Sequence, residues 1–131
     1  MIYVDTSALA KIIVPERESE QLRRFFGTTE NDRLATSHLT VVELHRTALR
    51  HPQVALTQTI ASVLSHLNTT AMTQEIVNRA AALKPAALRA LDAIHVATAL
   101  EIRADLLVTY DRRMVEACQA NNLEVVSPGA S

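Results

Sequence analysis

Apolar residues gather along this chain in short runs that end on a polar residue, and in longer stretches between those runs. The short runs are typical of strands, and we expect strands at 1–5, 33–37, 105–110 and 123–127, with a weak one at 68–73. The longer stretches are typical of helices, which we expect at 6–14, 16–26, 38–50, 54–67, 74–84, 88–100 and 111–122. Pro15 and the His51-Pro52 pair end two of these helices, because proline cannot continue a helix and restrains the residue before it.

This alternation of strands and helices predicts an α/β domain with a largely parallel sheet, rich in helix because two helices separate several of the strands. No repeat, low-complexity segment or change of composition divides the chain. We therefore expect a single domain over residues 1–131, with a loose tail at 128–131. Hydrophobic residues make up 48% and charged residues 21% of the chain, as in a folded soluble protein with a real core.

Composition excludes several classes of function. Cys118 is the only cysteine, which excludes an internal disulfide and a cysteine-cluster zinc site and fits a reducing compartment. The first residues lack the basic region of a signal peptide, and no apolar stretch is long enough to span a bilayer. We therefore expect a cytoplasmic protein that does not bind a membrane. Aromatic residues make up only 3% of the chain, so we do not expect a platform on which bases stack. Because the net charge is -1, any nucleic acid must be bound through a local patch or a metal.

Asp92 interrupts the otherwise apolar helix expected at 88–100. Apolar residues lie at helical spacing on both sides of it, and an ionised carboxylate on a buried face is costly unless something compensates it. Arg89, Arg103 or a backbone donor could satisfy Asp92 as a structural acid. A bound cation could compensate it equally well, and the two interpretations stay open on the residues alone.

Asp5 and Asp111 stand at the ends of two expected strands, each directly before a helix. Aspartate is a good helix N-cap, so each residue could be only a cap. Thr6 and Ser7 are also candidate caps for the first helix, which would leave Asp5 free. Ligands of open α/β sheets bind at the carboxyl ends of the strands, so neighbouring strands would bring both acids to one rim.

Glu43 lies between two apolar residues of the helix expected at 38–50. It could be a surface acid paired with Arg46 or Thr47 one turn further on. Together with Asp5, Asp92 and Asp111, however, it would form an acidic cluster, in which repulsion requires a cation. Oxygen ligands of this kind select Mg²⁺ or Mn²⁺, for which Asp5 and Asp92 are the candidate metal ligands.

Four segments resemble the PIN domain, and the order and length of the whole chain resemble a VapC-type toxin of bacterial toxin–antitoxin pairs. The segments are IYVDTSAL at the start, VVEL around Glu43, LDAIHVATAL around Asp92 and LLVTYDRRM around Asp111. The resemblance implies a five-stranded parallel sheet flanked by helices and a metal-dependent ribonuclease site. It assigns the catalytic acids and the supporting hydroxyls to these residues: Asp5, Glu43, Asp92 and Asp111, with Thr6 or Ser7, and Thr109.

The last of these segments departs from the family pattern. Met114 is nearest to the position where the family usually has a phenylalanine, and Tyr110 stands directly before Asp111. Asp111 can therefore act through a water molecule rather than bind the metal directly.

The resemblance also implies a mechanism and partners. A metal-activated water would attack the phosphate of a structured RNA, tRNA or ribosomal RNA, and leave a 5′-phosphate and a 3′-hydroxyl. The expected assembly is a homodimer bound to a small antitoxin, whose tail wraps the toxin and can place an arginine among the acids. Eleven of the 13 basic residues are arginine, which suits bidentate contacts to phosphate. The candidate RNA contacts are Arg46, Arg50, Arg112 and Arg113.

Two other classes of protein are rivals to the nuclease. A haloacid-dehalogenase-like phosphatase would need a second acid where Ser7 stands, and an inert interaction domain would use the acids only as caps and ion pairs.

The histidines lack the spacing of a zinc site. His95 lies one turn after Asp92 and could form a hydrogen bond near the site, although a satisfied, half-buried histidine is the simpler interpretation.

Overall fold

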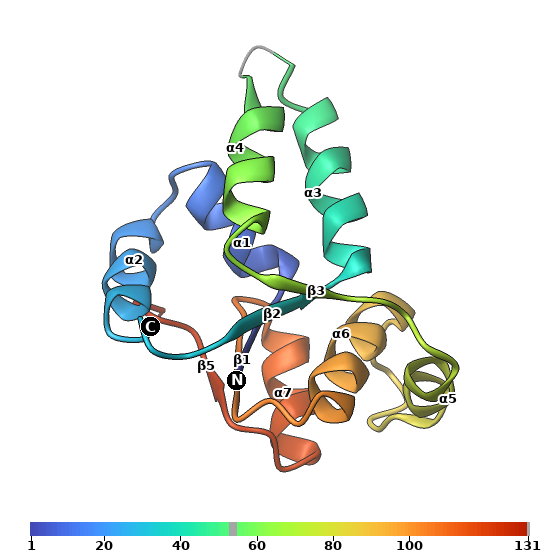
Figure 1. The fold of residues 1–131 in the computed structure, drawn as a ribbon. Coiled ribbons are helices and arrows are strands. Elements are labelled where there is room, and N and C mark those ends of the chain that lie inside the picture. The colour runs from blue at the N-terminus through green and yellow to red at the C-terminus, as the bar shows by residue number, and fades with distance from the viewer. Residues whose placement is uncertain (53–54, 131) are drawn as a thin grey trace.

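The computed structural model describes residues 1–52 and 55–130 of the chain. Its strands are β1 (Ile2–Val4), β2 (Leu34–Ser37), β3 (Asn68–Thr70), β4 (Leu106–Val108) and β5 (Val125–Val126). Its helices are α1 (Thr6–Ile13), α2 (Ser19–Gly27), α3 (His38–Leu49), α4 (Leu56–Leu64), α5 (Gln74–Ala82), α6 (Ala90–Glu101) and α7 (Arg112–Ala120). Every strand and helix expected from the sequence is present in the expected order (Figure 1).

The five strands form one sheet in the order β3-β2-β1-β4-β5, and all four neighbouring pairs are parallel. The predicted fold class, a five-stranded parallel sheet flanked by helices, is therefore confirmed. β1 lies at the centre and pairs with β4, with Val4 opposite Val108. The residues that follow these two strands consequently meet at the same rim of the sheet.

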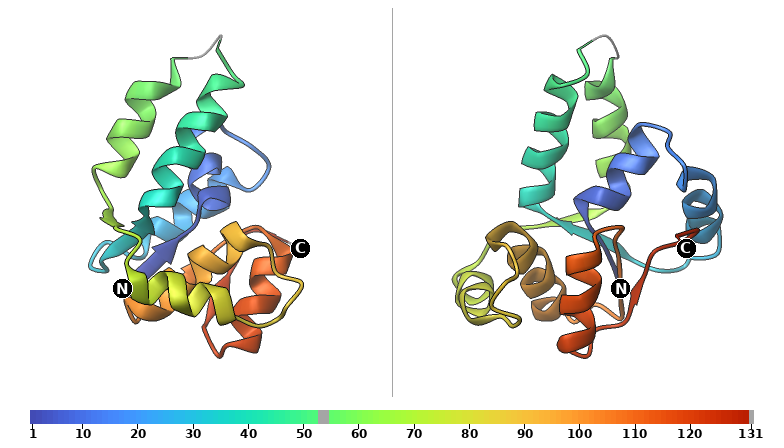
Figure 2. Two further views of the ribbon diagram at one scale, coloured as in Figure 1. Left: turned by 90° about the vertical axis from the view of Figure 1, so that its right-hand side faces the viewer. Right: turned by 180° about the vertical axis from the view of Figure 1, so that it is seen from behind.

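Helices cover both faces of the sheet, and each face has its own core (Figures 1 and 2). Ile2 and Val4 pack with buried residues of α1 to α4 on one face, whereas Tyr3 packs with α6 and α7 on the other. Because side chains alternate along a strand, this central strand is apolar at every position rather than at every second one. α5 packs against α6, and α3 and α4 form a helix pair that extends away from the sheet (Figure 2).

Several expected boundaries were wrong by a few residues. α2 begins at Ser19 rather than at residue 16, because the backbone N–H of Glu16 donates to the Ser19 hydroxyl and Lys11 binds both Glu16 and Glu18. α6 begins at Ala90 rather than at 88. β4 and β5 are shorter than the expected runs at 105–110 and 123–127, and α7 is shorter than 111–122.

The helix expected at 54–67 includes residue 54, which lies outside the described residues, and the described helix is Leu56–Leu64. Residue 131 of the expected tail lies outside them as well. Over the described ranges, each helix falls short of the length and apolar character needed to cross a bilayer.

Candidate active site

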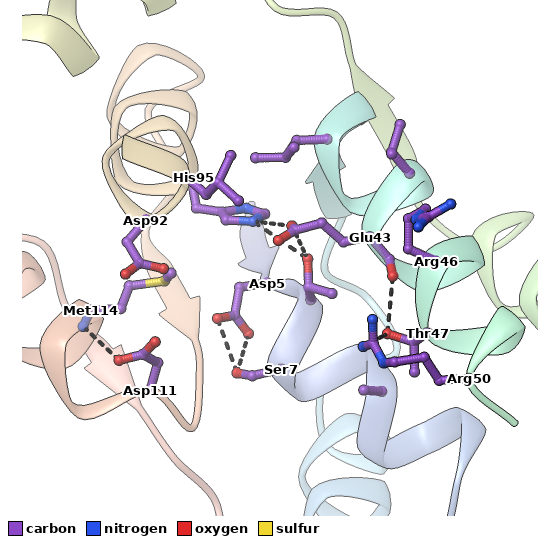
Figure 3. Close-up of a pocket in the computed structure, with 15 residues that line it drawn as sticks. Asp5, Ser7, Glu43, Arg46, Thr47, Arg50, Asp92, His95, Asp111 and Met114 are labelled. Atoms are coloured by element: carbon purple, nitrogen blue, oxygen red, sulfur yellow. Dashed lines mark hydrogen bonds and ion pairs between the residues drawn. The ribbon is translucent and has the colours of Figure 1, made fainter. Parts of the chain in front are cut away.

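A pocket of about 640 Å³ opens at the carboxyl ends of β1 and β4, and all four acids expected to be catalytic line it (Figure 3). Asp5 follows β1, Glu43 lies on α3, Asp92 lies on α6, and Asp111 precedes α7. In the close-up, the carboxylates of Asp92 and Asp111 face that of Asp5 across the pocket. Thr6, Ser7 and His95 belong to the same lining.

Asp5 is the most buried of these acids, with 2% of its surface exposed. Its Oδ1 accepts hydrogen bonds from the backbone N–H of Ala8 at 3.0 Å and from the Ser7 hydroxyl at 2.8 Å, and its Oδ2 accepts one from Thr109 at 2.6 Å. Of the three candidate caps of α1, the Asp5 side chain is the cap, and Thr6 and Ser7 are not. Burial raises the pKa of Asp5, and the nearby His95 and these hydrogen bonds oppose that rise.

Ser7 and Thr109 connect the ends of β1 and β4. The Ser7 hydroxyl binds Asp5 and accepts a hydrogen bond from the backbone N–H of Tyr110 at 2.9 Å. Thr109 accepts one from the backbone N–H of Asp111 at 3.0 Å while donating to Asp5. Ser7 stands where a dehalogenase-like phosphatase would have its second acid, and here it holds the first acid in place.

Glu43 is held from two other elements. Its Oε1 accepts hydrogen bonds from the Thr6 hydroxyl at 2.6 Å and from Nε2 of His95 at 2.8 Å. Partial burial raises the pKa of Glu43, but these hydrogen bonds and the His95 charge outweigh it and leave the pKa below its ordinary value. The alternative, that the Glu43 side chain pairs with Thr47, was wrong, because the Thr47 hydroxyl donates to the backbone carbonyl of Glu43 instead.

Asp92 is half-buried rather than fully buried, and it faces the pocket (Figure 3). Among the described residues it accepts no hydrogen bond, so neither Arg89, Arg103 nor a backbone donor satisfies it in the way that the structural interpretation required. Burial raises the pKa of Asp92, and the Asp111 carboxylate raises it further, while the charges of His95 and Arg89 oppose the shift. The charges of His95 and Arg89 thus compensate Asp92 only in part, and its half-exposed carboxylate stays accessible from the pocket.

Asp111 has two roles. It is the N-cap of α7, and its Oδ1 accepts hydrogen bonds from the backbone N–H groups of Arg113 at 2.8 Å and Met114 at 3.4 Å. It also lines the pocket beside Asp92 (Figure 3). The capping interpretation is thus correct for one carboxylate oxygen, and the second oxygen remains for the pocket.

The four candidate RNA-binding arginines separate into two pairs. Arg46 lies on α3 and Arg50 is the C-cap of that helix. Both line the pocket, and Arg50 donates to the Thr47 hydroxyl (Figure 3). Arg112 and Arg113 begin α7 next to Asp111, but they line two other hollows of the surface. The structure therefore brings only the first pair together with the acids.

The donor set of the pocket fits Mg²⁺ or Mn²⁺. All four acids offer hard carboxylate oxygens, and those of Asp92 accept no protein hydrogen bond over the ranges described. No group of three or more histidine, cysteine, aspartate or glutamate residues in those ranges is arranged to hold a metal by itself. Mg²⁺ is commonly held by one or two carboxylates and keeps several waters, so a two-carboxylate site agrees with this arrangement.

His95 is satisfied, as the simpler interpretation held, and it also forms a hydrogen bond at the site. Its side chain is almost completely buried, with 2% of the residue exposed, rather than half-buried. Both ring nitrogens have close partners, Tyr3 at 2.6 Å and Glu43 at 2.8 Å. The only signal in the sequence was its place one turn after Asp92, because its partners lie 92 and 52 residues away along the chain.

Comparison with known proteins gives full-length relatives. Ribonuclease VapC47 of Mycobacterium tuberculosis is 38% identical over 134 residues, which cover 99% of this chain and 98% of that protein. Ribonuclease VapC35 of the same species is 43% identical over 133 residues, 98% of each chain. Both relatives therefore resemble this chain over almost all of its length.

Solved structures show the same fold at lower identity. A toxin–antitoxin complex from Klebsiella pneumoniae matches with a TM-score of 0.78 and 23% identity over 100% of both chains. VapC20 of M. tuberculosis, a sarcin-ricin loop cleaving toxin, matches with a TM-score of 0.77 and 16% identity over 98% of this chain and 100% of that one. Residues 2–120 match the family described as the PIN domain. With this match and the full-length relatives, the chain belongs to the PIN domain family and, within it, to the VapC ribonucleases.

Proposed function

We propose that the protein is a metal-dependent endoribonuclease that acts as the toxin of a toxin–antitoxin pair and cleaves a structured RNA, tRNA or ribosomal RNA. The observation that carries the proposal is the pocket in which four carboxylates gather at the ends of β1 and β4. Arg46 and Arg50 line the same pocket, so that it combines an acidic centre with side chains suited to bind phosphate.

Asp5 and Asp92 are the residues that would hold Mg²⁺, with Mn²⁺ as a substitute. The bound ion would supply two effects, a lower pKa of a bound water and neutralisation of charge on the phosphate. Asp5 is oriented for this role by Ser7, Ala8 and Thr109. Asp92 suits the same role because its carboxylate is half-exposed and accepts no hydrogen bond from the described residues.

Glu43 is placed to accept the proton of the attacking water. The donors Thr6 and His95 keep its pKa low, so the carboxylate is ionised near neutral pH. In-line attack breaks the bond between phosphorus and the 3′ oxygen, which takes up a proton from solvent. The products are a 5′-phosphate and a 3′-hydroxyl. Arg46 and Arg50 would bind the phosphates on either side of the cut.

The test is digestion of total RNA by the purified protein with and without Mg²⁺, followed by mapping of the new ends. We expect cleavage at few positions, only with Mg²⁺ or Mn²⁺, and complete loss in Asp5→Asn. Asp32→Asn, the same change at an exposed loop residue, is the control and should keep full activity. Metal-independent cleavage, or equal rates in parent and Asp5→Asn with contaminating nuclease excluded, would contradict the proposal.

The proposal includes a small antitoxin partner and a cytoplasmic homodimer. Complexes from K. pneumoniae, Rickettsia felis and Salmonella typhimurium that share this fold are toxin–antitoxin or VapBC assemblies, which supports the partner. We expect the chain to co-purify with the product of an adjacent small gene, and RNA cleavage to fall when that product is added. Light scattering should give twice the mass of the 14.4 kDa chain. A monomer at high concentration would contradict the homodimer.

A further inference from the structure

Two hydrogen bonds in a row, one buried and one part-buried, connect Glu43 through His95 to Tyr3 at the centre of the sheet. The hydroxyl of Tyr3 on β1 contacts Nδ1 of His95 at 2.6 Å, and Nε2 of the same ring contacts Oε1 of Glu43 at 2.8 Å. Tyr3 is completely buried and His95 is 2% exposed. Figure 3 shows the imidazole directed at the Glu43 carboxylate from α6.

The chemistry of these groups fixes the direction of the row. A phenol keeps its proton near neutral pH, so the hydroxyl of Tyr3 can donate it to Nδ1 of His95. An imidazole that accepts at Nδ1 carries its proton on Nε2, which then donates to the carboxylate of Glu43. A protonated ring would also donate from Nε2. The bond from His95 to Glu43 therefore has the same direction in both states of the ring.

We propose that His95, held by Tyr3, is a positioning residue that fixes the carboxylate of Glu43 toward the pocket. This proposal rests on the proposed ribonuclease function of the same site. The side chain of a glutamate on a helix has several rotatable bonds, and without His95 only the Thr6 hydroxyl would restrain that of Glu43. The rigid imidazole adds a second restraint at the same oxygen and leaves the other oxygen, Oε2, for the proton of the attacking water.

A purely structural histidine would have the same burial but different consequences. His95 lines the pocket, and Glu43 is the partner through which it would act. Removal of a positioning residue misplaces the reacting carboxylate, which lowers kcat, while RNA binding through the arginines on α3 is unchanged. Removal of a residue that only stabilises the fold lowers the melting temperature and leaves kcat of the folded enzyme unchanged.

The first experiment compares three substitutions of His95. Gln places an amide N–H near the position of Nε2, Asn places one near Nδ1, and Leu has neither. We expect His95→Leu and His95→Asn to lower kcat on the order of 100-fold with little change in KM, and His95→Gln to recover most of the loss. Thr98→Val on the same helix removes another buried hydrogen bond, from Thr98 to Ile94, and serves as the control that should keep full kcat.

The second experiment tests whether His95 acts through Glu43. In a Glu43→Gln background, His95→Leu should cause little further loss of kcat, because the group that it positions is already gone. Losses that multiply in the double variant, or a fall of kcat in Thr98→Val equal to that in His95→Leu, would overturn the proposal.

A third measurement does not need activity. Long-range proton–nitrogen correlation spectra of the full chain should place the His95 proton on Nε2, and its signal should shift in Glu43→Ala and in Tyr3→Phe. Absence of RNA cleavage by the parent would defeat the proposed function without affecting this readout. A proton on Nδ1 alone, or an Nε2 signal that ignores Glu43→Ala, would overturn the assignment of His95.

Discussion

At the scale of single residues, the four carboxylates of the pocket differ in how the protein compensates them. Glu43 has two strong donors, and its pKa is low despite partial burial. Asp5 has donors on both oxygens, yet complete burial still raises its pKa. Asp92 has no protein donor in the described ranges and lies beside Asp111, so burial and repulsion both raise its pKa. Asp92 is thus the acid that gains most from a cation.

Asp92→Asn should stabilise the protein when metal is absent. A carboxyl whose pKa is raised in the folded state binds a proton more tightly there than in the unfolded chain. Its cost to stability is absent below the unfolded pKa, grows as the pH rises toward the folded pKa, and is complete above it. At neutral pH in EDTA, we expect a gain of about 1 kcal/mol or less, because solvent screens a half-exposed group. This gain corresponds to a rise in Tm of up to about 4 °C.

The same variant should lose the response to Mg²⁺. A ligand that binds only the folded state, at 100 times its Kd, stabilises by about 2.7 kcal/mol, and we expect this rise in Tm for the parent but little of it for Asp92→Asn. Asp105→Asn is the control. The amino terminus pairs with this exposed acid and lowers its pKa, so replacing Asp105 should not raise Tm. A lower Tm of Asp92→Asn in EDTA would identify Asp92 as a structural acid.

The four acids could be predicted because a strand end and an interrupted apolar helix are local patterns. The resemblance also named the supporting hydroxyls as Thr6 or Ser7, and Thr109. It did not show which acid each hydroxyl binds, or that His95 binds Glu43. The hydrogen bond from Thr6 to Glu43 joins residues 37 positions apart, and that from His95 to Glu43 joins residues 52 apart. Such contacts depend on which helices face each other across the sheet, and no spacing in the chain encodes them.

At the scale of elements, two helices begin on acids of the site. Asp5 caps α1 and Asp111 caps α7, so in both cases one side chain ends the loop, starts the helix and lines the pocket. The order of elements was predictable because both faces of the sheet are covered, which makes the inner strands β1 and β4 apolar at every position. β3, at the edge of the sheet, is polar and was expected only as a weak strand. The start of α2 was not predictable, since Lys11 and Ser19 fix it through contacts between neighbouring elements.

Substitutions of Asp111 should separate its capping role from its role in the pocket. Asparagine caps helices about as well as aspartate, whereas loss of a cap to alanine costs about 1 kcal/mol. We therefore expect Asp111→Ala to lower the free energy of unfolding by about that amount and Asp111→Asn to leave it nearly unchanged. Both variants should cleave RNA more slowly, because both lack the charge.

Thr73 provides the control for this comparison. It caps α5 by accepting a hydrogen bond from the backbone N–H of Ile76 at 3.3 Å, and it lies outside the lining of the acidic pocket. Thr73→Ala should lose similar stability in urea denaturation while keeping the rate of RNA cleavage. Full cleavage by Asp111→Asn would instead show that Asp111 is only a cap.

At the scale of the whole molecule, the protein carries a formal net charge of -1, while its proposed substrate, RNA, is a polyanion. Long-range attraction to RNA is therefore weak, and the acids of the pocket oppose it further. In the proposed function, attraction has to come from a bound metal and from arginines near the cut. Arg46 on α3 and Arg50 at its C-cap are exposed and line the pocket, so they are the positive groups best placed to offset the carboxylates.

RNA binding should consequently depend on salt through these two arginines. Each phosphate that a protein neutralises adds about 0.7 to 0.9 to the slope of log Kd against log salt concentration. We expect Arg46→Gln and Arg50→Gln each to reduce the slope by about that amount, measured by titration of a non-cleaving Asp5→Asn background with RNA. Arg24→Gln, on α2, removes an exposed arginine that pairs with Glu20 and should leave the slope unchanged. If the two α3 variants keep the parental slope, RNA approaches the acids without them, and Arg112 and Arg113 at the start of α7 become the groups to substitute next.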